Sequence, residues 1–234
     1  MFPNRWFFCC LISWLPCLAN AGVEPNTVLL DARFNDQPLN AQIGTGGASL
    51  GQPVSISAGL QAFVVPSGVL PTASLRVRPL ASGAARFVSF EFVDSAEVTD
   101  GLLTINFLLK AGQLDRRLVY VREQGSAGRD FLSMTLLSSG SIAVSDQSGN
   151  SASIGTYTAG ALMAFEFRFK MDTGRYSIFL NGVPLATDRA HGITDRGIGS
   201  LIIGTDPAST EGLDWFVDDV QAFRLDELLV DGFE

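Results

Sequence analysis

Apolar and polar side chains alternate with a period of two in several parts of the chain, and this pattern limits the fold more than any other feature of the sequence. The segment 163–170 (MAFEFRFK) alternates over its full length, and segments 88–92, 103–109 and 132–136 repeat the pattern. Successive side chains of a β-strand point to opposite faces of a sheet, so each segment is expected to be a half-buried strand. No stretch of similar length shows a sustained helical period, and helix is therefore expected to be a minor component.

Turn-forming residues lie between the alternating segments. Asn181 and Gly182 predict a two-residue hairpin turn between strands at 175–180 and 183–186. Strand signals recur at intervals of roughly ten residues, which is typical of an antiparallel sandwich or barrel. The segment 44–59 is rich in Gly, Ala and Ser. It is expected to form a loop and a short strand at a sheet edge.

The first 21 residues have the pattern of a secretory signal peptide. Arg5 is followed by the apolar run Trp6–Leu18, and small residues at Ala19 and Ala21 fit cleavage after Ala21. All three cysteines, Cys9, Cys10 and Cys17, lie in this segment. The sequence therefore predicts an exported, cysteine-free domain that acts in the extracellular space or the periplasm. No later apolar run is long enough for a bilayer, so no membrane span is expected.

The remainder of the chain is expected to be one domain, because no Gly-rich or charged linker divides residues 22–225. The sequence is 47% hydrophobic and 17% charged, which excludes the composition of a disordered chain. Its formal net charge of −8 excludes a basic surface for nucleic acid. Residues 226–234 form a short tail. Its last seven residues, 228–234 (LLVDGFE), resemble the end of many unrelated exported proteins of Gram-negative bacteria, and the tail is interpreted as an export or surface-sorting tag.

Three segments of the chain resemble a known superfamily. They are the strand 27–34 (TVLLDARF), the hairpin 169–185 (FKMDTGRYSIFLNGVPL) and the closing strand 215–223 (WFVDDVQAF). In these segments the chain resembles the concanavalin A-like lectins and glucanases, especially the laminin-G-like branch. The resemblance implies an all-β fold, an antiparallel two-sheet jelly-roll β-sandwich of about 12–14 strands. It also implies that the last strand lies beside the first, and that a curved face or rim loop binds glycans.

The catalytic motifs of that superfamily are not reproduced. Retaining glucanases need paired carboxylates on one strand face, and the nearest approach, Glu91 to Glu97, has the wrong spacing. A polysaccharide lyase needs a base and a group that neutralises a carboxylate. His191 is the sole histidine and lies between Arg189 and Arg196 in the irregular segment 188–199. These three residues are the candidate catalytic set, and the alternative is a connecting loop whose charges pair locally.

Binding of a glycan needs an accessible aromatic ring with hydrogen-bonding neighbours. The candidate ligand-binding residues are Trp215, Tyr157, Asp188, Arg189, His191 and Arg196. For Trp215 the alternative, a core position in the last strand, is the favoured interpretation. Tyr176 alternates with apolar residues and is expected in the core.

Calcium is the one cofactor for which the sequence offers ligands. The aspartates Asp31 and Asp36 lie on or just after the expected first strand, and Asp218 and Asp219 lie on the last. If these strands are neighbours, their carboxylates could hold one structural Ca²⁺. In the alternative, the aspartates face solvent or accept backbone hydrogen bonds.

The sequence thus favours a secreted, non-catalytic jelly-roll domain that binds a glycan or a cell-surface partner. One alternative is a polysaccharide-acting enzyme, either a lyase or a glycosidase, that uses the 188–196 loop. Another is a structural or adhesive surface protein, which would require a broad apolar patch.

Overall fold

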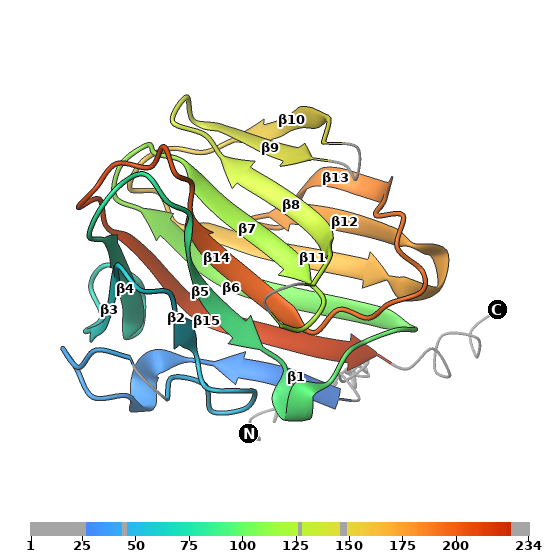
Figure 1. The fold of residues 1–234 in the computed structure, drawn as a ribbon, viewed down its shortest axis with the longest axis horizontal. Helices are drawn as coiled ribbons and strands as arrows, with labels where there is room; N and C mark the ends of the chain where they lie inside the picture. Colours follow the sequence, from blue (N-terminus) through green and yellow to red (C-terminus); the bar gives the residue numbers. More distant parts are fainter. Residues whose placement is uncertain (1–26, 44–45, 126–127, 146–148, 226–234) are drawn as a thin grey trace, which may run out of the picture.

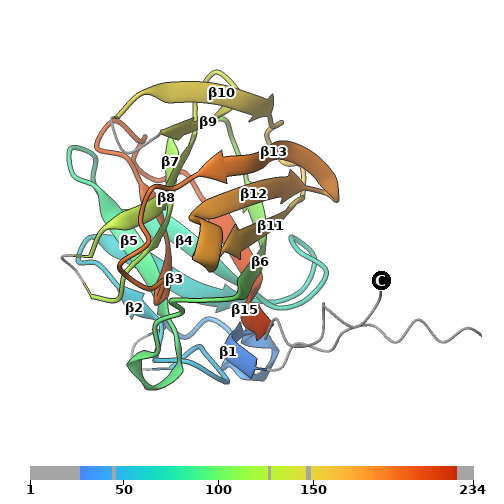
Figure 2. The same cartoon turned by 90° about the vertical axis from the view of Figure 1, so that its right-hand side faces the viewer.

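The computed structural model of the chain describes residues 27–43, 46–125, 128–145 and 149–225 (Figure 1). The signal peptide expected at 1–21 and the tail at 226–234 lie outside these described residues. Within them the fold is two antiparallel β-sheets that pack face to face as a sandwich (Figures 1 and 2). This confirms the all-β class and selects the sandwich over the barrel.

The larger sheet has eight strands. They are β1 (Thr27–Ala32), β3 (Leu60–Val65), β4 (Ser74–Pro79), β6 (Leu102–Ala111), β11 (Met163–Lys170), β12 (Arg175–Leu180), β13 (Val183–Ala190) and β15 (Trp215–Leu225). Their order across the sheet is β13-β12-β11-β6-β15-β4-β3, and β1 pairs with β15 beside this path.

The smaller sheet has seven strands. They are β2 (Ser55–Ile56), β5 (Arg86–Glu91), β7 (Arg117–Arg122), β8 (Asp130–Leu136), β9 (Ser141–Ser145), β10 (Ser151–Thr156) and β14 (Ser200–Thr205). Their order is β10-β9-β8-β7-β14-β5-β2, so the two-residue strand β2 closes one edge, as the composition of 44–59 predicts. The helical content of the described residues is three 3₁₀ turns, η1 (Phe34–Asp36), η2 (Val93–Ser95) and η3 (Met171–Thr173).

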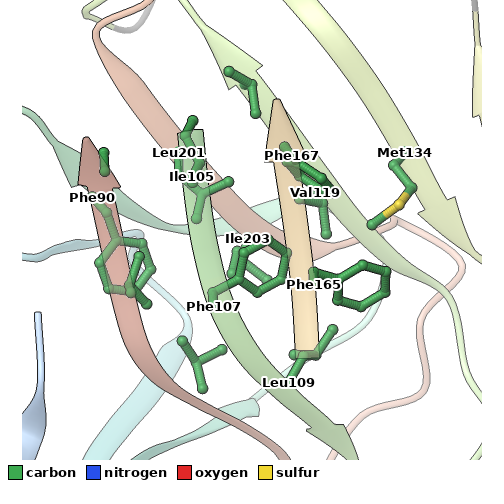
Figure 3. Close-up of a cluster of buried hydrophobic side chains, with 14 of the residues drawn as sticks. Phe90, Ile105, Phe107, Leu109, Val119, Met134, Phe165, Phe167, Leu201 and Ile203 are labelled. Atoms are coloured by element: carbon green, nitrogen blue, oxygen red, sulfur yellow. The ribbon is translucent and has the colours of Figure 1, made fainter. Parts of the chain in front are cut away.

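The core lies between the two sheets and is built from the inward-facing half of each alternating strand (Figure 3). On β6 and β11, Phe107 stacks on Phe165 with ring centroids 5.2 Å apart and meets Phe167 edge-on at 5.3 Å. Ile203 of β14 approaches this cluster from the other sheet (Figure 3). Because successive residues face opposite ways, every second side chain of these strands is removed from water.

The last strand, β15, joins parts of the chain that are far apart in sequence. It pairs with β6 along most of its length, with β4 at its start and with β1 at its end, all antiparallel. Between Asp218 and Gln221 the register shifts, and Asp219 has a positive φ of 49°. The bulge marks the point where the partner on one side changes from β4 to β1. The expected pairing of first and last strands is therefore present.

The turn at Asn181 and Gly182 has positive φ angles at both residues, as a type I′ hairpin requires. The strand after it is longer than the sequence predicts. It continues to Ala190, so Asp188 and Arg189 belong to β13 and not to a loop. Asp188 takes a φ of 51° in a bulge that lets Arg189 pair with Tyr176. No helix in the described part of the chain is long and apolar enough to cross a membrane.

Candidate functional site

A pocket of about 350 Å³ opens where one end of each sheet comes together. It takes residues from β8 and β9 of the smaller sheet and from β12 and the end of β13 of the larger one, at the end of the sandwich that Figures 1 and 2 show in yellow and orange. The lining residues are Gly128, Arg129, Asp130, Phe131, Ser133, Ser145, Gly149, Tyr176, Ala190 and His191. Of the sequence-predicted site residues, His191 alone lines this pocket.

His191 is buried among aromatic rings, with 2% of its surface exposed. The Phe131 ring lies 5.1 Å from the imidazole and the Phe169 ring 6.2 Å. Burial lowers the pKa of His191 to about 4, so the ring is neutral at pH 7. Its Nδ1 accepts the backbone N–H of Ile193 at 3.3 Å, which assigns the single ring proton to Nε2. Among the described residues this Nε2–H has no hydrogen-bond partner.

The backbone fixes His191 at the last step of the β12–β13 ladder. Its N–H donates to the carbonyl of Gly174 at 2.9 Å. Gly174 ends η3 in the left-handed region, at φ 63°, where a residue with a side chain would be strained. A Cβ at Gly174 would also lie 3.2 Å from the Thr194 side chain. The glycine in the turn Asp172–Gly174 thus lets the chain close tightly around the histidine.

Charged side chains at the rim of the pocket are paired with one another. Arg129 lies 3.3 Å from both Glu123 and Asp195, and Arg196 lies 3.9 Å from the same two carboxylates. Hydrogen bonding from Arg129 lowers the pKa of Asp195. One interpretation of the segment 188–199 is a connecting loop whose charges pair locally. Arg196 shows this local pairing, with Glu123 and Asp195.

Asp130 lines the pocket beside these rim pairs. Its carboxylate lies 3.0 Å from the guanidinium of Arg122 on the neighbouring strand β7. Burial raises the pKa of Asp130. The two charged residues that line the pocket, Arg129 and Asp130, are thus both ion-paired. Ser133 has a side-chain hydrogen bond with Tyr120, and the neutral groups Ser145 and His191 remain for a ligand.

Trp215 does not belong to the pocket. It is fully buried in the core of β15, where it pairs with Val77 on one side and Ala111 on the other. No face of its ring is left for a sugar. The structure therefore supports the core interpretation of Trp215. A strand with a hydrogen-bonded neighbour on each side buries its inward-facing residues completely.

Tyr157 also lies elsewhere and has a structural role. Its hydroxyl lies 2.8 Å from the carbonyl of Leu137 and 2.9 Å from that of Asp115, and it accepts the N–H of Asp115 at 3.3 Å. The tyrosine in the pocket is Tyr176, which is 5% exposed and packs against Phe169 at 5.9 Å. Tyr176 is thus both a core residue and part of the pocket wall.

Three of the four aspartates proposed for calcium have separate side-chain partners, and the fourth, Asp219, lies at the bulge of β15. Asp31 binds the guanidinium of Arg33, which lowers its pKa, and Asp218 is fully buried with a hydrogen bond from Thr72. Asp36 lies beside the amide of Gln37.

No group of three or more His, Cys, Asp or Glu in the described residues could hold a metal. The four aspartates therefore do not converge as one group of ligands in the described part of the chain. Calcium binding stays a prediction, which thermal unfolding in Ca²⁺ and in EDTA tests.

The sequence did not single out the pocket residues Arg129, Asp130, Phe131, Ser133 and Ser145. They come from β8, β9 and the preceding turn, at least 45 positions before His191. A register shift opposite Val121 leaves Phe131 as an extra residue in β8, so Phe131 and its neighbour are both buried. This bulge breaks the alternation by which inward residues are recognised, and no local motif marks the site.

Taken with its pocket, the fold places the chain among antiparallel two-sheet β-sandwiches. No family model matches the chain, and no curated protein sequence matches it. Solved structures with TM-scores of 0.50–0.58 match it at 11–13% identity, which shows a shared fold and no more.

Three of these structures illustrate the likeness. A sialidase aligns over 74% of this chain and 17% of its own, with 12% identity and a TM-score of 0.58. A carbohydrate esterase from a Shiga toxin-encoding bacteriophage aligns over 86% of this chain and 99% of its own, with 13% identity and a TM-score of 0.55. The ligand-binding domain of botulinum neurotoxin serotype D, in complex with N-acetylneuraminic acid, aligns over 85% and 48%, with 12% identity and a TM-score of 0.53.

Proposed function

We propose that this protein is a non-catalytic carbohydrate-binding domain and that the pocket at His191 holds the saccharide. The observation that carries the proposal is that His191 lines the pocket while its buried Nε2–H lacks a hydrogen-bond partner among the described residues. A buried donor without an acceptor costs free energy, and a hydroxyl group of a bound sugar would satisfy it. The hydroxyl of Ser145 in the same lining would add a further hydrogen bond.

The comparisons support the proposal at the level of fold. One of the similar structures is a ligand-binding domain in complex with N-acetylneuraminic acid, and another is a carbohydrate esterase. We assign this chain to the concanavalin A-like sandwiches, and within them to the laminin-G-like branch, on the three segments 27–34, 169–185 and 215–223. The pairing of β1 with β15 is consistent with that assignment.

The protonation state of His191 favours binding over catalysis. A general base needs a free lone pair, and here the lone pair of Nδ1 already accepts the Ile193 N–H. The other nitrogen carries the proton and can only donate. His191 is thus suited to hold a hydroxyl oxygen in place and not to take a proton from a substrate.

Binding to an array of glycans, followed by titration calorimetry with two variants, tests the proposal. Ser145→Ala removes one hydroxyl from the pocket lining, and we expect about tenfold weaker binding of the glycan identified on the array. Ser141→Ala is the matched control, because Ser141 is equally half-buried on the same strand, β9, but outside the pocket. His191→Phe keeps an aromatic ring between Phe131 and Phe169 while removing the donor, and we expect it to abolish measurable binding. Equal affinities in all three variants, or no glycan bound at all, would refute the proposal.

A polysaccharide-acting enzyme is the second candidate. The pocket brings His191 together with Arg129 and Tyr176, the combination of residue types that a lyase uses. Incubation of the protein with uronate polymers and β-glucans distinguishes the two functions. Release of new reducing ends or of unsaturated products, lost in Tyr176→Phe, would establish the enzyme and contradict the non-catalytic proposal.

We also propose that the domain acts outside the cytoplasm, on the basis of the secretory pattern at 1–21. An adhesive role has less support. The large apolar side chains that are exposed, Leu39, Leu80, Leu114, Leu162 and Val183, come from five separate segments of the described chain.

A further inference from the structure

The outer face of the larger sheet carries a row of polar side chains at one level. Asn106 on β6 lies directly opposite Glu166 on β11 and directly opposite Gln221 on β15. Gln221 in turn lies opposite Asp31 on β1. The flanking residues on β6, Ile105 and Phe107, are buried in the core, so these four side chains point away from it. Four neighbouring strands thus present one hydrogen-bonding side chain each, at intervals of about 4.8 Å.

This row borders a hollow of about 440 Å³. Asn106, Glu166 and Gln221 all line it, and the small residues Ala164 and Gly182 form part of its wall. A Cβ added at Gly182 would meet no atom within 4 Å, which shows how open this side is. None of the lining residues is shared with the pocket at His191.

The carboxylates in the row are already compensated. Asp31 binds Arg33, with Nε to Oδ1 at 2.8 Å, and accepts the Gln221 amide at 3.3 Å. Glu166 pairs with Arg168 two residues along the same strand. The Arg168 guanidinium also lies over the Phe179 ring, at 4.6 Å. Arg33 is the one cation among the described residues that line the hollow, and it is held by Asp31. The hollow therefore lacks the unpaired positive charge that an anionic ligand requires.

The carboxamide of Asn106 stands in the middle of the row without a side-chain hydrogen bond to any described residue, although it is half-buried. It offers two donor hydrogens and one acceptor oxygen. Hydroxyl groups match this set, because each can donate and accept. A chain of linked sugar units lying across the strands would place hydroxyls along successive members of the row.

We propose that the hollow beside Asn106 is a second saccharide-binding site, which takes an uncharged oligosaccharide running across β11, β6 and β15. This site is independent of the pocket at His191, and either could bind without the other. Its ligand class follows from the paired carboxylates and the free carboxamide.

Titration calorimetry with cellohexaose, laminarihexaose and xylohexaose tests the second site. Asn106→Leu keeps the size of the side chain and removes its hydrogen bonds. We expect it to weaken binding of at least one hexaose about tenfold or more. Thr104→Val is the matched control, since Thr104 lies on the same face of β6 but outside the hollow, and it should leave the affinity unchanged. Gln221→Leu is a second variant of the row in case Asn106→Leu does not fold, which thermal unfolding would reveal.

The outcomes separate the two sites. Weaker binding in Asn106→Leu with unchanged binding in Ser145→Ala supports the second site, whatever the result at His191. Binding that Ser145→Ala weakens and Asn106→Leu leaves intact overturns the second site and supports the proposed function. Binding of pentagalacturonate, lost in Asn106→Leu, would overturn the assignment to uncharged sugars. No binding of any hexaose overturns the second site.

Discussion

At the scale of single residues, the protonation state of His191 is set by the packing around its ring. A histidine in a solvated loop would titrate near its ordinary pKa and offer both nitrogens to ligands. Here the aromatic surroundings hold the ring neutral, and a backbone contact two residues ahead fixes which nitrogen is protonated. The identity of the residue was visible in the sequence, but its protonation state depends on Phe131, Phe169 and the Ile193 N–H.

The lowered pKa of His191 predicts that stability falls as the pH drops below about 6.5. Between the unfolded value near 6.5 and the folded value of about 4, the unfolded chain binds more protons. The free energy of unfolding therefore decreases by up to about 1.4 kcal/mol per pH unit in this window, and the stabilisation is fully present above it. Urea unfolding at several pH values between 7.5 and 5 measures the slope.

His191→Phe is the comparison, because the sequence has one histidine. The variant should show a smaller loss of stability between pH 6.5 and 5 than the natural protein. The raised pKa values of Asp130 and Asp218 have the opposite effect on the slope, but they are common to both proteins and cancel in the difference. Parallel curves for the two proteins would mean that His191 is solvated.

At the scale of elements, irregularities in the strands place the functional residues. The bulge in β8 turns Phe131 into the core beside His191, and the bulge in β13 at Asp188 carries the chain to the pocket. The bulge in β15 lets one strand pair with β4 and then with β1. Regular parts of strands follow from alternation, whereas a bulge depends on the partner strand and is not visible in the sequence of one strand alone.

Gly204 on β14 predicts a test of strand packing. A Cβ at this position would lie 2.3 Å from the carbonyl oxygen of Arg86 and 2.4 Å from the Phe87 ring. Gly204→Ala should therefore push apart β14 and β5 and destabilise the protein by about 1–3 kcal/mol. Gly46→Ala is the control, because its nearest new contact is 3.5 Å and the substitution should change stability little. Thermal and urea unfolding measure the stability of both variants. Equal stability of Gly204→Ala and Gly46→Ala would contradict the close packing of β14 against β5.

At the scale of the whole molecule, a buried ion pair fixes the long connection between β14 and β15. Asp115 and Arg117 are almost fully buried, and Arg117 Nη1 lies 2.5 Å from Asp115 Oδ2. The same carboxylate accepts the N–H of Thr210 at 3.1 Å, and Arg117 donates to the carbonyl of Leu213. The pair thus joins segments nearly a hundred positions apart, which no local sequence pattern indicates.

Arg117→Leu should be strongly destabilising, because it leaves the Asp115 carboxylate buried without its cation. We expect a loss of about 3–5 kcal/mol, which for a domain of this size lowers Tm by roughly 10 °C. Arg78→Leu is the matched control, since Arg78 pairs with Asp214 at 2.7 Å in a half-exposed setting. That change should cost roughly 1 kcal/mol or less. Similar melting temperatures for the two variants would contradict a structural role for the buried pair.

The sequence by itself determined the class of fold and most of its strands. Alternation over 163–170 and the Asn181-Gly182 turn act within one strand or hairpin, where the pleat and the signs of φ leave few choices. The tertiary structure alone decided which residues meet. It placed Trp215 in the core, put Asp188 and Arg189 in a strand, and brought Ser145 and Asp130 to His191. Such contacts depend on the register between strands far apart in the chain. Neither the amino-acid composition nor the two-residue alternation within a strand predicts that register.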